Sequence, residues 1–171
     1  KQMVVKALTA AERARLPRRA VLVGRLAEAM AYVEQGLEVT GNNLELGRRE
    51  FGFSYRVFFV SVRAGMLGAM GRLEDSCREM KHALRVARDS GIPENLGWTL
   101  GSVPGLADYT GELAFEDLGD AKAAALEALR IAEDLGSAFS RAAAYANMGV
   151  APLVAGEFVE AGRFLADTLE L

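Results

Sequence analysis

The sequence has very few residues that could support catalysis or metal binding. Cys77 is the one cysteine and His82 the one histidine, which excludes a disulfide within the chain and leaves too few soft ligands for a zinc site. They are five residues apart on a predicted helix, so their side chains point about 140° apart and do not form a nucleophilic dyad. The glycines form no phosphate-binding loop. We therefore expect no catalytic residue, metal site or cofactor, and a protein that is not an enzyme.

Excess positive charge and a long apolar run are also missing. The net charge is -3 and the pI about 5.3, so we expect neither nucleic acid nor anionic lipid as a partner. We interpret the local cluster of Arg13, Arg15, Arg18, Arg19 and Arg25 as a solvated face. The longest uncharged run, 142–156, is shorter than the roughly 20 residues of a membrane helix. We expect a cytoplasmic protein that does not span a membrane.

The alternating Val, Ile and Thr runs typical of strands are nearly absent. Alanine and leucine dominate the apolar residues and aromatic residues are only 8% of the chain. These preferences favour helices over strands. The composition therefore predicts an all-α fold.

Four segments of the chain superimpose on one another. They start at Gly24, Gly71, Glu116 and Gly156, so that successive starts are 47, 45 and 40 residues apart. Each segment has a small residue five positions after its start. Each also has a small residue twelve positions after its start, followed directly by Leu. We interpret each segment as the second helix of a helical hairpin, beginning near 24, 71, 116 and 156. The small residue allows the two helices to approach closely, and the Leu fills the space between hairpins. The whole chain, 1–171, is predicted to form one repeat domain with an α-α superhelix.

The first helices of the hairpins are expected before these segments, at 54–70, 94–113 and 137–155. Helix-ending residues occur between them, at 41–43, 90–93 and 135–137. Pro104 should kink or break the third hairpin's first helix, and 110–117 should absorb extra residues. Residues 1–16 are interpreted as a further helix. Because the chain begins with Lys1 and not Met, we expect it to be a piece of a longer protein.

These repeats resemble the tetratricopeptide family. More narrowly, phrases such as Gly71-Arg-Leu-Glu-Asp, Glu94-Asn-Leu-Gly-Trp98 and the run 128–141 resemble the long-period repeats of bacterial AAA- and STAND-type signalling ATPases, including adenylate or guanylate cyclase-like proteins and maltose-regulator-like transcription factors. The resemblance implies a scaffold that binds a peptide or helix in a concave groove lined by first helices. It implies no chemistry in the repeats themselves.

We expect the partner to be a protein or peptide segment, or an adjacent domain of the parent protein. The candidate groove residues are Tyr55, Phe58, Arg63, Trp98 and Asn147. The dense aromatic group Phe51, Tyr55, Phe58 and Phe59 is interpreted as one helical face. Two alternatives stay open: a small-molecule sensor that regulates an attached ATPase or cyclase, and a spacer that forms homo-oligomers through its end repeats.

Overall fold

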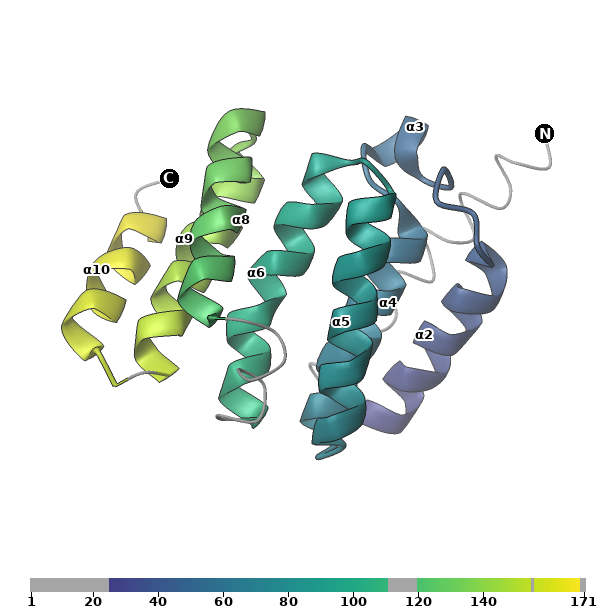
Figure 1. The fold of residues 1–171 in the computed structure, drawn as a ribbon, viewed down its shortest axis with the longest axis horizontal. Coiled ribbons are helices and arrows are strands. Elements are labelled where there is room, and N and C mark those ends of the chain that lie inside the picture. The colour runs from purple at the N-terminus through teal and green to yellow at the C-terminus, as the bar shows by residue number, and fades with distance from the viewer. Residues whose placement is uncertain (1–24, 111–119, 155, 170–171) are drawn as a thin grey trace.

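Every regular element in the described part of the chain is a helix, as the composition predicted. The structure, a computed structural model, describes residues 25–110, 120–154 and 156–169. The helices are α2 (Leu26–Thr40), α3 (Arg48–Phe51), α4 (Tyr55–Ala69), α5 (Leu73–Asp89), α6 (Pro93–Thr110), α8 (Ala121–Leu135), α9 (Ala138–Val154) and α10 (Phe158–Leu169). They succeed one another along the long axis of the molecule, from α2 at one end to α10 at the other (Figure 1). The predicted helix at 1–16 and the insertion at 110–117 lie wholly or largely outside the described residues.

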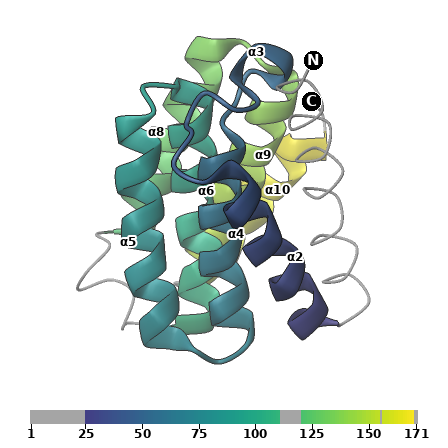
Figure 2. The ribbon, with the colours of Figure 1, turned by 90° about the vertical axis from the view of Figure 1, so that its right-hand side faces the viewer.

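The helices pack as successive hairpins. The most extensive contacts join α4 to α5, α6 to α8 and α9 to α10. Each first helix also packs against the second helix of the preceding hairpin, so that α4 lies between α2 and α5 (Figure 2). The first helices α4, α6 and α9 contact one another in order. This stacking confirms the predicted α-α superhelix of helical hairpins.

The predicted helix-ending residues are where the helices end. Gly41, Gly91 and Gly136 follow α2, α5 and α8 with φ of 51°, 62° and 65°, backbone angles that glycine adopts without a steric penalty. At the other end of two helices a side chain caps the first turn. The Asp120 carboxylate accepts a hydrogen bond from the backbone N–H of Lys122, and the Ser137 hydroxyl accepts one from the N–H of Ser140. Local sequence signals therefore place most helix ends.

The matched small residues are buried in every hairpin. The residue five positions after each predicted start is at most 4% exposed, whether it is Ala29, Ser76, Ala121 or Ala161. In α5 the Ser76 hydroxyl donates a hydrogen bond of 2.6 Å to the backbone carbonyl of Ala64 on α4. A larger side chain at this position would separate the helices of the hairpin, which explains the pattern.

One continuous core extends through most of the stack. It includes the fully buried Val33 of α2, Phe59 of α4 and Met80 of α5, and it continues into α6 and α8. A smaller cluster of Ala125, Met148 and Ala151 joins α8 to α9. None of the helices in the described ranges combines the length and the hydropathy of a membrane-spanning segment.

Three expectations require correction or refinement. The helix α8, which is the second helix of the hairpin that begins with α6, starts at Ala121 and not near 116, because Asp120 provides its N-cap. Pro104 does not break α6, which continues from Pro93 to Thr110. The aromatic group does not share one helical face: Phe51 lies on α3 and is 48% exposed, whereas Phe59 lies on α4 and is fully buried. The short helix α3 lengthens the connection between α2 and α4.

Candidate functional site

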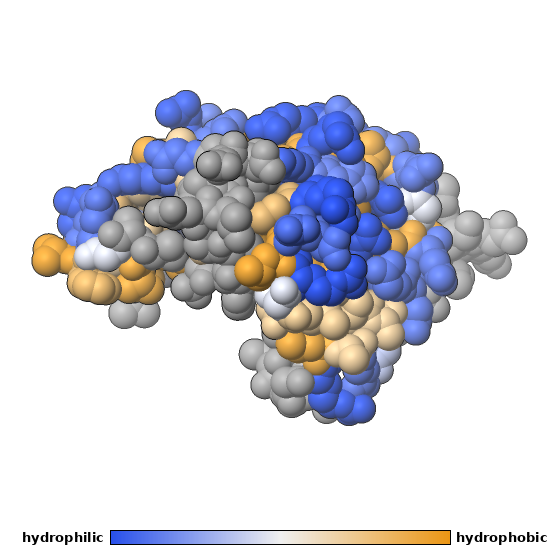
Figure 3. Space-filling view, turned by 60° about the horizontal axis from the view of Figure 1, so that its bottom comes forward, coloured by the Kyte–Doolittle hydropathy of each residue, from blue (hydrophilic) through white to orange (hydrophobic). Residues whose placement is uncertain are grey.

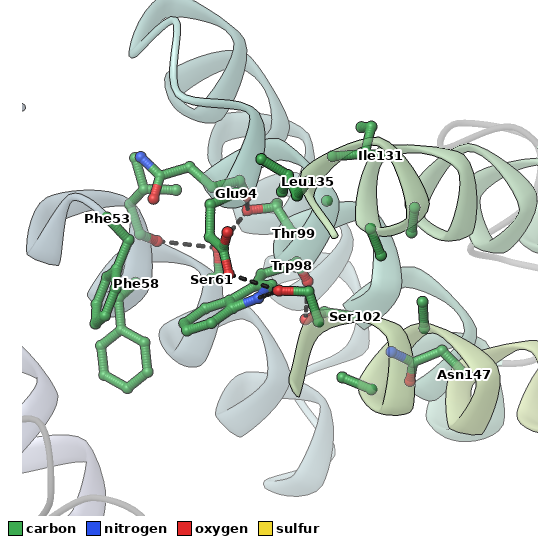
Figure 4. A pocket seen from close by; sticks show the side chains of 18 of the residues that line it. Phe53, Phe58, Ser61, Glu94, Trp98, Thr99, Ser102, Ile131, Leu135 and Asn147 are labelled. Atoms are coloured by element: carbon green, nitrogen blue, oxygen red, sulfur yellow. Dashed lines mark hydrogen bonds between the residues drawn. The ribbon is translucent and has the colours of Figure 1, made fainter. Parts of the chain in front are cut away.

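A cavity lies where α4, α6, α8 and α9 meet. Its volume is about 310 Å³, and it is partly open to solvent. The first helices α4, α6 and α9 provide most of the wall, and the C-terminal half of α8 and Phe53, just before α4, provide the rest. Most of the lining surface is apolar. A few polar groups on these helices reach into it (Figure 4).

Trp98 of α6 forms the central wall of the cavity. Its ring centroid lies 5.0 Å from that of Phe53, and Phe53 in turn lies 6.2 Å from Phe58. Phe53 and Phe58 lie on one side of Trp98, with Ile131 and Asn147 on the other (Figure 4). Partly exposed aromatic rings of this kind provide a large, stiff apolar surface for a ligand.

A hydrogen-bonded chain holds the indole in place. The Trp98 Nε1–H donates to the Ser140 hydroxyl at 3.4 Å, and that hydroxyl donates to a Glu94 carboxylate oxygen at 2.6 Å. Ser140 is 4% exposed. These two hydrogen bonds link the N-terminal turns of α6 and α9, so they fix both the Trp98 rotamer and the position of α9 against α6.

Asn147 of α9 provides a second polar group. A Cβ added to Gly101 would lie 2.7 Å from the Asn147 amide nitrogen, so the missing side chain of Gly101 makes room for this carboxamide. Within the described part of the chain, the structure gives the Asn147 side chain no hydrogen-bond partner. Its donor and acceptor groups are therefore available to a ligand or to water.

The polar groups deeper in the site are paired internally. The Ser61 hydroxyl of α4 lies 3.1 Å from the Thr99 hydroxyl of α6. Each hydroxyl also lies within hydrogen-bond distance of the carbonyl four residues earlier on its own helix. This pair joins α4 to α6 across the cavity floor and leaves little capacity for a ligand.

Three of the five predicted groove residues line the cavity, namely Phe58, Trp98 and Asn147. Tyr55 does not, because it is 2% exposed and packs at the start of α4 against Phe51, Phe53 and Gly47. A buried ring cannot contact a partner, so its assignment to the groove is corrected.

Arg63 is the second correction. Its guanidinium donates to a Glu79 carboxylate oxygen on α5 at 3.0 Å and lies 3.4 Å from a carboxylate oxygen of Glu34 on α2. The hydrogen bond to Glu79 raises the pKa of Arg63 above its ordinary value. The side chain is therefore directed toward the second helices α2 and α5 and does not line the cavity. It is a positioning group between hairpins.

Sequence reasoning missed Glu94, Ile131 and Ser140, which also line the cavity. They come from the start of α6, the end of α8 and the start of α9. No motif marks them, because only the packing of three helices brings them together. Away from the cavity, Cys77 is buried, and no cluster of three or more His, Cys, Asp or Glu side chains in the described residues could hold a metal ion.

Comparison with known proteins identifies a similar fold but no family. No protein-family model matches the chain, and no curated protein matches it. Among solved structures, the crystal structure of BtubC (BKLC) from P. vanneervenii is similar, with a TM-score of 0.61 and 15% sequence identity. The alignment covers 96% of this chain and 63% of the BtubC chain, so this chain spans less than two thirds of that protein. At this identity the likeness shows the fold alone.

Proposed function

We propose that this chain is a tetratricopeptide-type interaction module that binds an extended peptide segment of a partner, or of an adjacent domain, in the cavity beside Trp98. The matched small residues, the glycine-ended helices and the stacked hairpins support the repeat assignment. A parent protein of the bacterial signalling ATPase type and a cytoplasmic location belong to the same proposal, and they rest on the sequence resemblance alone. Binding of this kind requires no catalytic group.

The observation that carries the proposal is the combination of apolar walls with the Asn147 carboxamide, which has no hydrogen-bond partner among the described residues. A peptide backbone offers one donor and one acceptor at each residue, which a carboxamide can satisfy with both of its polar atoms. An adjacent apolar side chain of the peptide would enter the cavity against Trp98 and Phe58. Burial of that side chain would supply most of the affinity, and Asn147 would fix the register of the peptide.

A small-molecule sensor is the second candidate. The cavity volume of about 310 Å³ is near the lower end of the roughly 300 to 1,000 Å³ typical of small-molecule pockets. Glu94, Ser140 and the Trp98 indole converge on one wall. The partial opening of the cavity to solvent favours a peptide, because the rest of an extended chain must continue outside the site.

Trp98 is the one tryptophan of the chain, so its intrinsic fluorescence reports directly on the cavity. Peptides selected from a random library should change this emission on binding. Asn147→Ala and Phe58→Ala should each weaken binding by at least about five-fold, the loss expected from about 1 kcal/mol at an anchor residue. Asn42→Ala is the matched control, because Asn42 lies in the exposed turn after α2 and should leave binding unchanged.

The result also separates the two candidates. If no selected peptide changes the Trp98 emission or responds to the substitutions at Asn147 and Phe58, the peptide proposal is wrong. A response to members of a small-molecule library, lost in the same two variants, would instead establish the sensor.

A further inference from the structure

The wall of the cavity beside Trp98 contains a single charge. Of the described residues that line the cavity, Glu94 alone has a charged side chain, and the others are apolar residues, glycines or neutral polar residues. The structure gives Glu94 no cationic partner in the described part of the chain. The described wall therefore carries a net negative charge, although most of its surface is apolar.

The Glu94 carboxylate is held in place with one of its oxygens free. Oε1 accepts the hydrogen bond of 2.6 Å from the Ser140 hydroxyl, whereas Oε2 has no hydrogen-bond partner among the described residues. Glu94 lies in the first turn of α6, where the positive end of the helix dipole favours an anionic group. A carboxylate accepts hydrogen bonds and donates none. Oε2 can therefore be satisfied by water or by a donor that a ligand brings.

Three aromatic rings lie in the same wall as this carboxylate. Trp98 is one turn after Glu94 on α6, so the two side chains share a face of the helix, and both are hydrogen-bonded to the Ser140 hydroxyl. Phe53 and Phe58 continue the ring surface beside Trp98 (Figure 4). All three rings are half-buried. Because the face of an aromatic ring attracts cations, the rings and the carboxylate favour the same kind of group.

The two properties of the wall distinguish between possible occupants. An apolar side chain that filled the cavity would cover Glu94 without giving it a donor, and removing an unpaired carboxylate from water is costly. An acidic side chain would meet a like charge. An arginine or lysine side chain presents methylene groups to Trp98 and Phe58 and a cation to Glu94. A basic side chain therefore matches both the apolar surface and the charge.

Asn147 lies toward the other end of the cavity from Glu94. The side chain of Glu94 meets Ser140, and Asn147 lies against Gly101, so α6 and α9 run side by side in the same direction. The rise along α6 from residue 94 to residue 101 is about 10 Å. That distance corresponds to about three residues of an extended peptide. A basic residue within about three positions of the peptide group bound by Asn147 can therefore reach Glu94.

We infer, building on the proposed function, that the bound peptide segment carries an arginine or lysine that enters this cavity. Its methylene groups lie against Trp98 and Phe58, and its cation pairs with Glu94. Asn147 binds the backbone nearby. The partner segment is thereby defined by its chemistry as one with a basic residue, and acidic or wholly apolar segments bind poorly.

The test uses the peptides that a random library yields by their effect on Trp98 emission. They should share an arginine or lysine. In an arginine-containing peptide, citrulline keeps the shape of that side chain and removes its charge, and should weaken binding about ten-fold, as the loss of a charge-assisted pair predicts. Glu94→Gln keeps an acceptor for Ser140 and should weaken binding of the arginine peptide to a similar extent. It should leave the citrulline peptide unaffected.

Glu133→Gln is the matched control for the loss of a negative charge. Glu133 is exposed on α8 and lies about 160° around that helix from Ile131 and Leu135, which line the cavity. This variant should bind the arginine peptide like the wild type. A second measurement needs no variant: raising NaCl from about 0.05 to about 0.5 M should weaken binding of the arginine peptide more than binding of the citrulline peptide.

The outcomes separate this inference from the proposed function. Peptides that lose affinity in Asn147→Ala and Phe58→Ala, but share no basic residue or tolerate Glu94→Gln, would overturn the inference and leave the proposed function intact. Failure of every peptide to bind would overturn both. Propylguanidinium, which has no peptide backbone, should bind far more weakly than the arginine peptide. Equal affinity would show that the site takes a free small cation, and would overturn the assignment to a peptide side chain.

Discussion

Substitution of Gly36 by alanine should test the physical basis of the hairpin stack. Gly36 is buried near the C-terminal end of α2, at the small position twelve residues after the first predicted start. An added Cβ would lie 2.4, 2.4 and 2.6 Å from three carbons of the Phe59 ring on α4. Carbon atoms in favourable contact are about 3.5 to 4.0 Å apart. The ring or the helix would therefore have to move by more than about 1 Å.

Two effects of opposite sign contribute to the free energy of unfolding. Alanine is favoured over glycine in a helix interior by about 1 kcal/mol. Overpacking a core costs about 1 to 3 kcal/mol or more, and Phe59 is fully buried, so its ring cannot rotate into free space. The clash should prevail, and we expect Gly36→Ala to lower the free energy of unfolding by roughly 1 to 2 kcal/mol.

Gly65→Ala is the matched control. Gly65 lies inside α4, and its added Cβ would meet no atom within 4 Å. The same chemical change should therefore raise stability by about 0.5 to 1 kcal/mol. Urea denaturation followed by circular dichroism measures both variants through their midpoints at equal m-value.

A double-mutant cycle locates the cause. Phe59→Leu removes ring carbons that the new methyl group would contact, so Gly36→Ala should cost less in that background. A Gly36→Ala variant at least as stable as the wild type, or a cost that is unchanged when Phe59 is replaced, would refute the argument that close contact between hairpins requires glycine here.

Three further predictions concern polar contacts. The backbone N–H of Ser54 is buried and donates to the side-chain Oδ1 of Asn95 at 3.0 Å. Asn95→Ala leaves this N–H without a partner, so it should lower the free energy of unfolding in urea denaturation by about 2 to 3 kcal/mol, and a loss below about 0.5 kcal/mol would contradict this. Ser76→Ala should lower the free energy of unfolding by only about 0.5 to 1.5 kcal/mol, the value of its hydrogen bond to Ala64. Ser76→Leu should lower it clearly more in the same assay, because the larger side chain forces α5 away from α4. Equal losses would contradict the argument that a small residue is required at this position. The hydrogen bond from Lys122 lowers the pKa of Glu160, so the stabilisation from this pair is complete above the ordinary glutamate pKa and is lost as pH falls through the depressed value. In Lys122→Met, NMR titration should show the pKa of Glu160 back at its ordinary value. An unchanged pKa in this variant would exclude the pair as the cause of the shift.

The sequence determined the helices and their order because these depend on local properties. Glycine tolerates the positive φ that ends α2, α5 and α8, and this preference is visible at Gly41, Gly91 and Gly136 without any tertiary contact. The recurring small residue also identified the hairpins, since its buried position repeats with each second helix. The late start of α8 was missed because Asp120 was not recognised as an N-cap.

The site could be predicted only in part. Phe58, Trp98 and Asn147 were found as aromatic or amide residues on first helices, and the cavity includes them. Tyr55 and Arg63 belong to the same helix as Phe58, yet Tyr55 is buried and Arg63 pairs with acidic residues of α2 and α5. Helical periodicity gives the angle between two side chains on one helix. It does not tell which face of that helix lines the cavity and which face packs against its neighbours.

Tertiary structure alone decided two features. The cavity wall combines α4, α6, α8 and α9, and its shape depends on how closely those helices pack. The pairing of Arg63 with Glu34 of α2 and Glu79 of α5 is equally invisible in the sequence, because the three side chains meet only when the helices stack. A repeat in sequence specifies the residue at each position, but only the neighbouring hairpin in space decides whether that residue is removed from water.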